Sequence, residues 1–250
     1  MRGVIANNPR FRIITETEDY LVVDKPAPLK VHPNGPSTAP TLYDELRGLL
    51  AYELQFGGQV SIINRLDRET SGVTLVAKNA ETARRFGKAM HARQFHKTYV
   101  AIVHGWPDWD ALDFDGPILR KGEVAESIIH IRQTVHPDGA LCRTLFRVLE
   151  RIEKANGKRF AVIVCQPITG RMHQLRVHLS HLGFPIVGDK MYGRDETCYL
   201  EFMQTGWTPA LEEKLILKRQ ALHSTHLELE GVGAWDAVLP DDMRAFLDKE

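Results

Sequence analysis

The stretch NRLDRETSGVTLVAK (residues 64–78) joins a charged turn to a β-branched run typical of a buried strand. Asp67 lies between Arg65 and Arg68, so it is either part of a surface ion pair or an acid held for catalysis. In an extended segment, residues 65 and 67 point to one side and residue 68 to the other. An arginine that reaches toward a ligand cannot also be the buried partner of Asp67. The sequence therefore predicts that this partner comes from a distant part of the chain.

A helical pattern in RMHQLRVHLSHL (residues 171–182) provides a candidate partner. Its apolar residues Met172, Leu175, Leu179 and Leu182 form one stripe that is expected to face the core. At about 100° per residue, Arg176 lies at the border of this stripe. A partly buried guanidinium needs an anionic partner, and spacing alone makes Asp67 a candidate.

The remaining patterns predict an α+β fold with a mixed, mostly antiparallel sheet, because adjacent strand pairs alternate with a few helices. Paired strands are expected within residues 12–26 and 143–167, the latter pair joined at Asn156-Gly157. Thr41 and Asn79 are expected to begin helices, and Gly183 to end one. Residues 26–40 are expected to form a loop, further strands are expected at 96–105 and 221–240, and residues 106–139 have no clear pattern.

Charge and cysteine content restrict the class of protein. Lys+Arg and Asp+Glu balance at 32 each, whereas the last 23 residues are acidic. Five cations lie between residues 84 and 97 without an acid: Arg84, Arg85, Lys88, Arg93 and Lys97. This segment is either a solvated helix face or a phosphate contact. Cys142, Cys165 and Cys198 are widely spaced, which predicts free thiols in the cytoplasm.

Membrane and metal sites are not expected. No apolar run approaches the roughly 18 residues that span a bilayer. His173, His178 and His181 lack the i, i+4 spacing of a helical metal site, and His178 and His181 are expected on the polar side of their helix.

Several motifs together resemble the RluA family of pseudouridine synthases. NRLDRETSGVTLVAK resembles its HRLD-x-x-TSG signature, and QPITGRMHQLRVHLSHLGFPIVGDKMYG (residues 166–193) its second hallmark. HKTYVAIVHG (residues 96–105) resembles a K-x-Y-x-A strand of the same family. DYLVVDKPAPLKVHP and ALHSTHLELE match its opening and late strands, so the similarity extends from about residue 11 to about residue 230.

The resemblance implies a pseudouridine synthase fold: a central sheet flanked by helices, with an active-site cleft across it. Residues 1–250 would form a single catalytic domain without an additional N-terminal RNA-binding domain. The implied activity is isomerisation of a specific uridine in ribosomal or transfer RNA, with the target base flipped out of its stack. No cofactor is implied, the RNA is the expected partner, and the protein is expected to be a monomer.

Residue roles follow from the family motifs. Asp67 would be the essential catalytic residue, Tyr99 would pack against the uracil, and Arg176 would pair with Asp67. Arg65 would enter the RNA stack, and Leu175 would line the pocket. Further substrate contacts are expected from Arg171 and His173, and RNA backbone contacts from the cations of residues 84–97. Covalent attack by Asp67 and proton abstraction both remain open.

The chain departs from the family pattern at three places. Asn64 replaces the usual histidine, Lys30 stands where an apolar residue is common, and GVGAWDAVLPDD replaces a late His-Pro. Two other functions are alternatives: that of a non-catalytic RNA-binding protein on the same scaffold, and that of a metal-dependent hydrolase. The presence of Asp67 argues against the first, and the histidine spacing against the second.

Overall fold

The computed structural model describes residues 9–33, 39–193, 195 and 197–248, which form two compact units. Unit 1 comprises the residues up to His96 together with Ser224–Val238. Unit 2 comprises Lys97–His223 and the residues from Leu239 onward. The boundary between the units falls within two strands, β5 (Phe95–His104) and β11 (Leu222–Leu229). Part of the predicted loop at 26–40, residues 34–38, lies outside the described residues.

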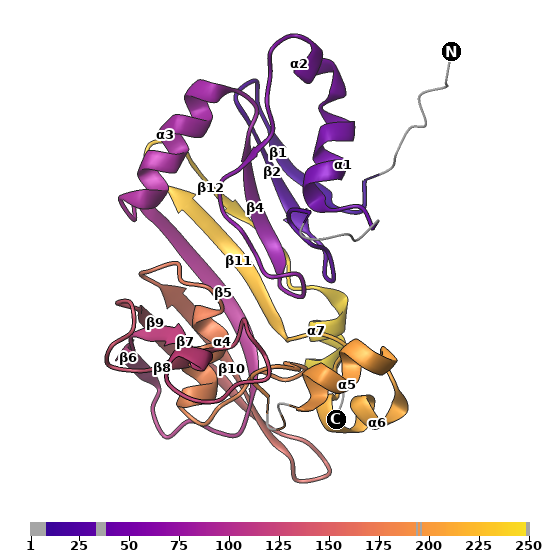
Figure 1. Cartoon of the computed structure of the whole chain (residues 1–250), viewed down its shortest axis with the longest axis vertical. Helices are drawn as coiled ribbons and strands as arrows, with labels where there is room; N and C mark the ends of the chain where they lie inside the picture. The colour runs from indigo at the N-terminus through magenta and orange to yellow at the C-terminus, as the bar shows by residue number, and fades with distance from the viewer. Residues whose placement is uncertain (1–8, 34–38, 194, 196, 249–250) are drawn as a thin grey trace. The chain divides into compact units, whose positions relative to one another are not determined.

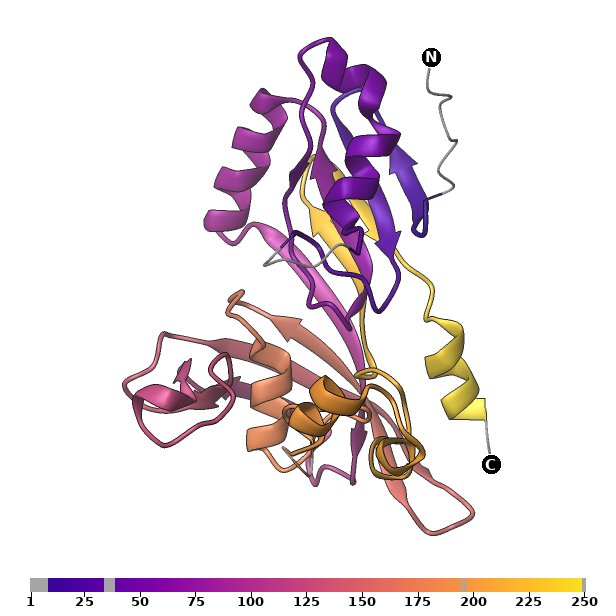
Figure 2. The same cartoon turned by 45° about the vertical axis from the view of Figure 1, so that its right-hand side comes forward.

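Unit 1 is a sheet covered by helices (Figures 1 and 2). Its strands follow the order β1-β2-β4-β11, with β3 beside β4 and β12 beside β11. The pairs β1–β2, β2–β4, β3–β4 and β11–β12 are antiparallel. The other elements are β1 (Arg12–Glu16), β2 (Tyr20–Lys25), α1 (Leu42–Leu49), α2 (Ala51–Gln55), β3 (Ser61–Ile62), β4 (Ser71–Ala77), α3 (Ala80–His91) and β12 (Gly233–Asp236).

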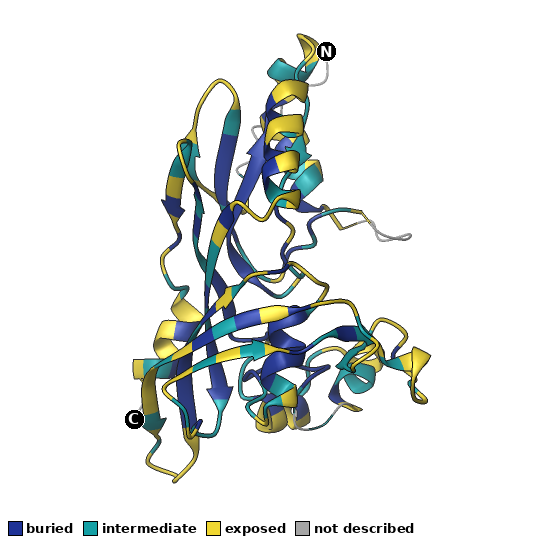
Figure 3. Cartoon of the chain, turned by 90° about the vertical axis from the view of Figure 1, so that its left-hand side faces the viewer, coloured by how far each residue is buried: buried dark blue, intermediate teal, exposed yellow. Residues whose placement is uncertain are grey.

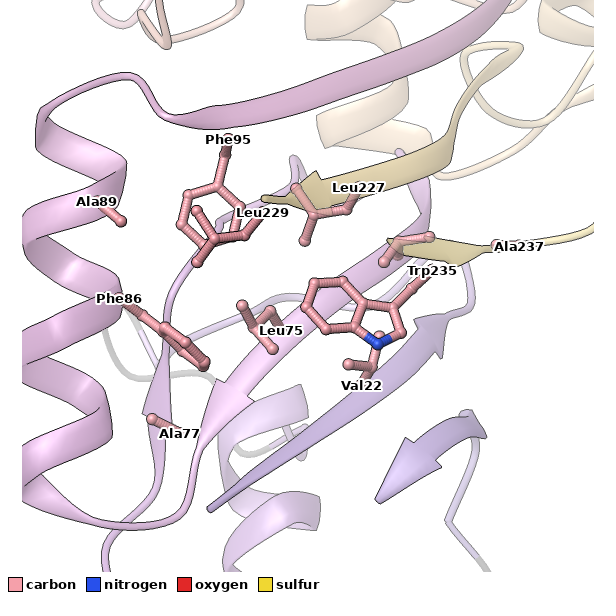
Figure 4. Close-up of a cluster of buried hydrophobic side chains, with 11 residues drawn as sticks. Val22, Leu75, Ala77, Phe86, Ala89, Phe95, Leu227, Leu229, Trp235 and Ala237 are labelled. Carbon is pink, nitrogen blue, oxygen red and sulfur yellow. The ribbon is translucent and has the colours of Figure 1, made fainter. Parts of the chain in front are cut away.

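Strand alternation gives unit 1 a core on each face of its sheet. On one face, Phe86 and Ala89 of α3 pack with residues of β2, β4, β11 and β12, including Trp235 (Figure 4). On the other, Leu42 and Leu46 of α1 pack with intervening residues of β2 and β4. Thr41 and Asn79 cap these helices as predicted, since each side chain accepts a backbone N–H bond.

Unit 2 has a second set of antiparallel strands in the order β5-β10-β9-β6, and a separate two-stranded sheet, β7–β8. Its other elements are β6 (Ala111–Asp115), β7 (Ile118–Arg120), a 3₁₀ turn at Lys121–Glu123, β8 (Gln133–Val135), β9 (Arg143–Glu153), β10 (Arg159–Pro167), α4 (Gln174–His181), α5 (Thr197–Thr205), α6 (Pro209–Leu215) and α7 (Asp241–Asp248). Gly157 has a φ of 74° in the turn between β9 and β10, as the Asn-Gly dipeptide predicts. The predicted α+β class with a mixed, mostly antiparallel sheet is confirmed.

The acidic C-terminal segment forms α7, which the sequence patterns did not predict. Asp242 makes a bidentate pair with the buried Arg219, at 2.6 and 2.8 Å. Lys154 donates to the carbonyls of Phe246 and Leu247 at the end of the helix, where cations are favoured. Within the described part of the chain, no helix is long and apolar enough to cross a membrane.

Candidate active site

In unit 1, Asn64 fastens the turn that carries Asp67 to strand β4. Its buried side chain donates to the carbonyl of Val73 at 2.9 Å and accepts from the N–H of Leu75 at 2.8 Å. The amide thereby satisfies two backbone groups of β4, each costly to leave unpaired when buried. The departure from the family's usual histidine therefore affects a structural contact beneath the turn.

Lys25 fixes the other side of the turn. Its side chain is fully buried, and its ammonium donates to the carbonyls of Leu29 at 2.9 Å, Pro26 at 3.1 Å and Arg68 at 3.4 Å. The N–H of Leu29 also donates to the carbonyl of Arg68, at 2.9 Å. The Lys25 ammonium thus joins the loop after β2 to the Asp67 turn by hydrogen bonds to backbone carbonyls of both segments.

Within this turn, Asp67 is half-buried while Arg65 and Arg68 are exposed. The N–H of Thr70 donates to the carbonyl of Asp67 at 3.1 Å, which closes the turn. Burial, together with the charge of Arg65, lowers the pKa of His32, a residue that the sequence patterns did not single out. The predicted stacking residue Arg65 therefore has a neutral, aromatic neighbour.

Gly72 is required where β4 begins. It has a φ of 116°, and a Cβ atom there would lie 2.1 Å from the carbonyl oxygen of Ser224. No other residue type fits both the left-handed backbone and this close approach. The glycine of the TSG motif therefore allows β11 to lie against the start of β4, directly after the Asp67 turn.

In unit 2, Arg176 of α4 is buried and pairs with Asp189. Its Nε and Nη2 groups donate to the two carboxylate oxygens of Asp189 at 2.7 and 2.9 Å. One of these oxygens also accepts the backbone N–H groups of Met191 and Tyr192, each at 2.9 Å. Burial opposes ionisation of Asp189, but Arg176 and these hydrogen bonds outweigh it and lower the pKa of the carboxyl group.

Tyr192 connects Arg176 to His173. The Arg176 guanidinium lies over the Tyr192 ring at 4.9 Å, a cation–π contact. The Tyr192 hydroxyl is 2.9 Å from Nδ1 of His173 and accepts the N–H of Gln133 at 2.9 Å. The predicted substrate residue His173, in a left-handed conformation with a φ of 58°, therefore belongs to the same network as Arg176.

Gln174 organises the segment before α4. Its Oε1 accepts from the Thr169 hydroxyl at 2.8 Å and from the N–H of Arg171 at 3.0 Å. Its Nε2 donates to the carbonyl of Arg143 and to the Thr144 hydroxyl, each at 2.9 Å. The predicted substrate residue Arg171 is exposed, but its backbone is thereby fixed.

Two predictions about this helix are wrong. Met172 is not a core residue: α4 starts only at Gln174, and Met172 precedes it with 50% of its surface exposed. His178 does not face solvent: it is buried, bonded to the Thr144 hydroxyl at 3.0 Å and to the carbonyl of Gly116 at 2.8 Å. Six consecutive residues of α4 are buried, so both sides of the helix are covered and a single apolar stripe does not describe it.

The other candidates in unit 2 are Tyr99 and Leu175, which are both buried. Tyr99 lies in β5 opposite Cys165 of β10. Of the predicted RNA-backbone cations, Arg84, Arg85, Lys88 and Arg93 are exposed on or just after α3 in unit 1, and Lys97 is half-buried in β5 of unit 2. Figure 3 shows how exposed and buried residues are distributed along the chain.

The structure therefore gathers the candidates into two groups. Asp67, Arg65 and four of the cations belong to unit 1, whereas Tyr99, Arg171, His173, Leu175 and Arg176 belong to unit 2. Pairing of Asp67 with Arg176 stays a prediction. Sequence patterns missed Asp189 and Tyr192, although both lie in the GDKMYG end of the second motif.

Among the described residues, no group of three His, Cys, Asp or Glu side chains is placed to hold a metal ion. All three cysteines are buried and free. Burial raises the pKa of the Cys142 thiol to about 11 and also raises the pKa values of Cys165 and Cys198. These thiols are therefore protonated and poor nucleophiles at neutral pH.

Known proteins resemble this chain in sequence. The model of a family described as RNA pseudouridylate synthase matches residues 19–181. Ribosomal large subunit pseudouridine synthase D of Nitrosomonas europaea is 34% identical over 243 residues, which are 95% of this chain and 64% of that protein. The protein of the same name from Pseudomonas aeruginosa is 34% identical, over 95% of this chain and 71% of its own. An uncharacterized RNA pseudouridine synthase of Bacillus subtilis is 35% identical, over 78% of this chain and 61% of its own length. The chain thus spans less than two thirds of the Nitrosomonas and Bacillus relatives.

Solved structures resemble it as well. Human RNA Pseudouridylate Synthase Domain Containing 4 has a TM-score of 0.72 at 25% identity, covering 94% of this chain and 91% of that one. Human RNA Pseudouridylate Synthase Domain Containing 1 has a TM-score of 0.68 at 24% identity, which bears on the fold alone. These likenesses confirm the predicted pseudouridine synthase fold.

Proposed function

This chain belongs to the RNA pseudouridylate synthase family, and we propose that it converts a specific uridine of ribosomal or transfer RNA to pseudouridine. The reaction breaks the bond between N1 of the base and C1′ of the ribose, and forms a bond between C5 and C1′. The proton on C5 is lost and N1 gains one, so the isomerisation needs no oxidant or reductant. The observation that carries the proposal is the anchoring of the Asp67 turn by Asn64 and Lys25.

Asp67 is the proposed catalytic carboxylate. A carboxylate that attacks the sugar or the base, or that removes a ribose proton, must be held in one orientation. The contacts of Asn64 and Lys25 support this proposal because they hold the backbone of the turn that carries Asp67. Both routes, covalent attack and proton abstraction, are compatible with this arrangement.

Arg176 is proposed to pair with Asp67 through its guanidinium, which also holds Asp189. A guanidinium offers five N–H donors, and Asp189 engages Nε and Nη2. A pair with Asp67 would stabilise its ionised form and fix its direction. Tyr99 and Leu175 would contact the uracil, and Tyr99 would assist in removing the C5 proton.

RNA binding is assigned to the exposed cations and to the motif residues. Arg65 would fill the space left in the stack by the extruded base, which lowers the cost of base flipping. Arg171 and His173 would contact the substrate near α4. Arg84, Arg85, Lys88, Arg93 and Lys97 would contact phosphates, in which case RNA binding weakens as salt rises.

Asp67→Asn tests the proposal. Total RNA with tritium at C5 of uridine, from a strain lacking the gene, is the substrate, because each turnover releases that label. We expect a rate loss of about ten-thousandfold or more, with RNA binding retained. Glu18→Gln, an exposed acid of unit 1, is the control. Undiminished label release by Asp67→Asn would refute the role of this acid. Failure of the wild-type protein to release label would favour the non-catalytic RNA-binding alternative.

The cellular setting is part of the proposal. We place the protein in the cytoplasm as a monomer, with both units acting as one catalytic domain. Cell fractionation and sedimentation velocity test the first two statements. Mapping pseudouridines in the strain lacking the gene would identify the target uridine.

A further inference from the structure

Three exposed apolar side chains lie on segments that meet near the N-terminal end of α4 in unit 2. They are Ile131, Leu141 and Met172, with 47%, 68% and 50% of their surfaces exposed. Met172 immediately precedes His173, and Arg171 immediately precedes Met172. We call these four residues, Ile131, Leu141, Arg171 and Met172, the α4 rim.

Hydrogen bonds hold the segments of the α4 rim together. Nε of Arg171 donates to the carbonyl of Leu141 at 3.3 Å. Gln133 donates from its side chain to the carbonyl of Ile131 at 3.0 Å, and from its backbone N–H to the Tyr192 hydroxyl at 2.9 Å. That hydroxyl also bonds His173. The backbone that carries the three apolar side chains is therefore held by hydrogen bonds near His173 and Arg171.

A buried core supports these segments from below. Ile129 and Cys142, close neighbours in sequence of Ile131 and Leu141, pack with Val177 of α4 and with Tyr192. The exposed side chains therefore do not belong to an unfolded or frayed segment. Exposed apolar side chains that are grouped on an ordered surface and bordered by polar groups are a candidate interaction site.

Charge favours RNA as the occupant. The segments that carry the α4 rim contain three arginines. Arg143 is paired with Asp113 of β6, and Arg132 is half-buried over the Tyr192 ring, so the exposed Arg171 is the cation that faces solvent beside the apolar side chains. An unstacked nucleotide presents apolar base faces together with an anionic phosphate. Apolar side chains such as Leu, Ile and Met insert between bases in other nucleic-acid complexes. The same segment leads into α4, which carries Arg176.

We infer that the α4 rim binds the unstacked nucleotides that flank the target uridine, with Ile131, Leu141 and Met172 against the bases and Arg171 at a phosphate. The inference rests on the proposed function, because it concerns the same RNA. It assigns base contacts to Ile131 and Leu141, which lie outside the family motifs, and to Met172 within the second motif. It also predicts that the nucleobases beside the target contribute to affinity.

The test compares two RNAs and three variants by fluorescence anisotropy. The probes are a short labelled oligouridylate and the same chain with abasic sites. For the double variant Leu141→Ser/Met172→Ser we expect Kd for oligouridylate to rise about tenfold, as for loss of a base contact, with Kd for the abasic chain unchanged. The apolar double variant Leu141→Met/Met172→Leu should bind like wild type. Leu149→Ser, with 49% of Leu149 exposed on β9, is the matched control and should change neither value.

Three outcomes would overturn the inference. Unchanged binding of oligouridylate by the serine double variant would show that Leu141 and Met172 do not contact the bases. An equal loss for both probes would assign the effect to phosphates alone. Self-association of the wild type in sedimentation velocity, abolished in the serine double variant, would make a second copy the occupant. Binding is measured here without turnover, so a failure of the Asp67→Asn test leaves these outcomes distinguishable.

Discussion

Two of the bidentate arginine–aspartate pairs in unit 2, Arg176–Asp189 and Arg219–Asp242, differ in what surrounds the carboxylate. Asp189 is fully buried, and besides Arg176 it holds two backbone N–H groups. Asp242 keeps 42% of its side chain exposed, and its partner Arg219 also donates to the carbonyls of Gln220 and Leu222. Similar ion-pair geometry therefore serves two purposes. The first pair orients a guanidinium in the candidate active site, and the second attaches the C-terminal helix to the start of β11.

Arg176→Met should have the largest effect. It removes the guanidinium and leaves Asp189 as a buried, unpaired carboxylate, at a cost of about 3–5 kcal/mol in the free energy of unfolding. Label release from C5-tritiated RNA should fall below detection, while Arg176→Lys should retain more activity because it keeps the charge but loses the planar fork. Equal activity of the lysine and methionine variants would contradict an electrostatic role for Arg176.

Asp189→Asn should come next. The amide can still accept hydrogen bonds but no longer balances the buried guanidinium, so Arg176 shifts or rotates. We expect kcat to fall about a hundredfold from misplacement of the side chain, with little change in RNA affinity. Single-turnover kinetics and anisotropy separate these quantities. A variant that loses RNA affinity but keeps kcat would show that Asp189 only supports the fold.

Asp242→Asn is the matched control for Asp189→Asn. The exposed side of Asp242 lets water replace part of the lost contact, so we expect about 1–2 kcal/mol of destabilisation in urea unfolding. Activity of the folded fraction should equal that of the wild type. A loss of kcat comparable to that of Asp189→Asn would end the distinction between the two pairs.

Lowering the pH should have a smaller effect, a loss of folding stability that arises at His178. Burial lowers the pKa of this histidine, and the charge of His181 acts in the same direction. The hydrogen bond to the Gly116 carbonyl and the negative charge of Asp115 oppose the shift. The folded state therefore favours the neutral ring. Its contribution to stability is complete above the unfolded pKa of about 6.5 and is lost as pH falls through the lower folded pKa. Urea unfolding from pH 7.5 to 5 should show a shallower decline for His178→Gln than for the wild type. Parallel declines would assign the acid sensitivity to other groups.

Local chemistry explains which parts of the fold were predictable from sequence. Thr41 and Asn79 cap helices through contacts three residues away, and Gly157 turns a hairpin through its own backbone. Such features depend on near neighbours. The α7 helix depends instead on Arg219 and Lys154, far away in sequence, and was not predicted.

The candidate site was predictable where a motif carried it and not where packing decided it. Arg176 was correctly expected to be partly buried with an anionic partner, but Asp189 lies beyond the helix, in the following loop. The orientations of Met172 and His178 were wrong because α4 starts late and is covered on both sides. Hydrophobic periodicity predicts side-chain orientation for a helix that has one face exposed to solvent, and α4 has no such face along residues 174–179.

The side chain of Asn64 also limits how position 64 can vary. It must present one donor and one acceptor from a rigid planar group to adjacent backbone sites of β4. A neutral imidazole has the same pair of functions, which accounts for the histidine that the family motif usually carries there. Aspartate lacks the donor and leucine lacks both groups, so either side chain at position 64 would leave a buried backbone group of β4 without its hydrogen bond.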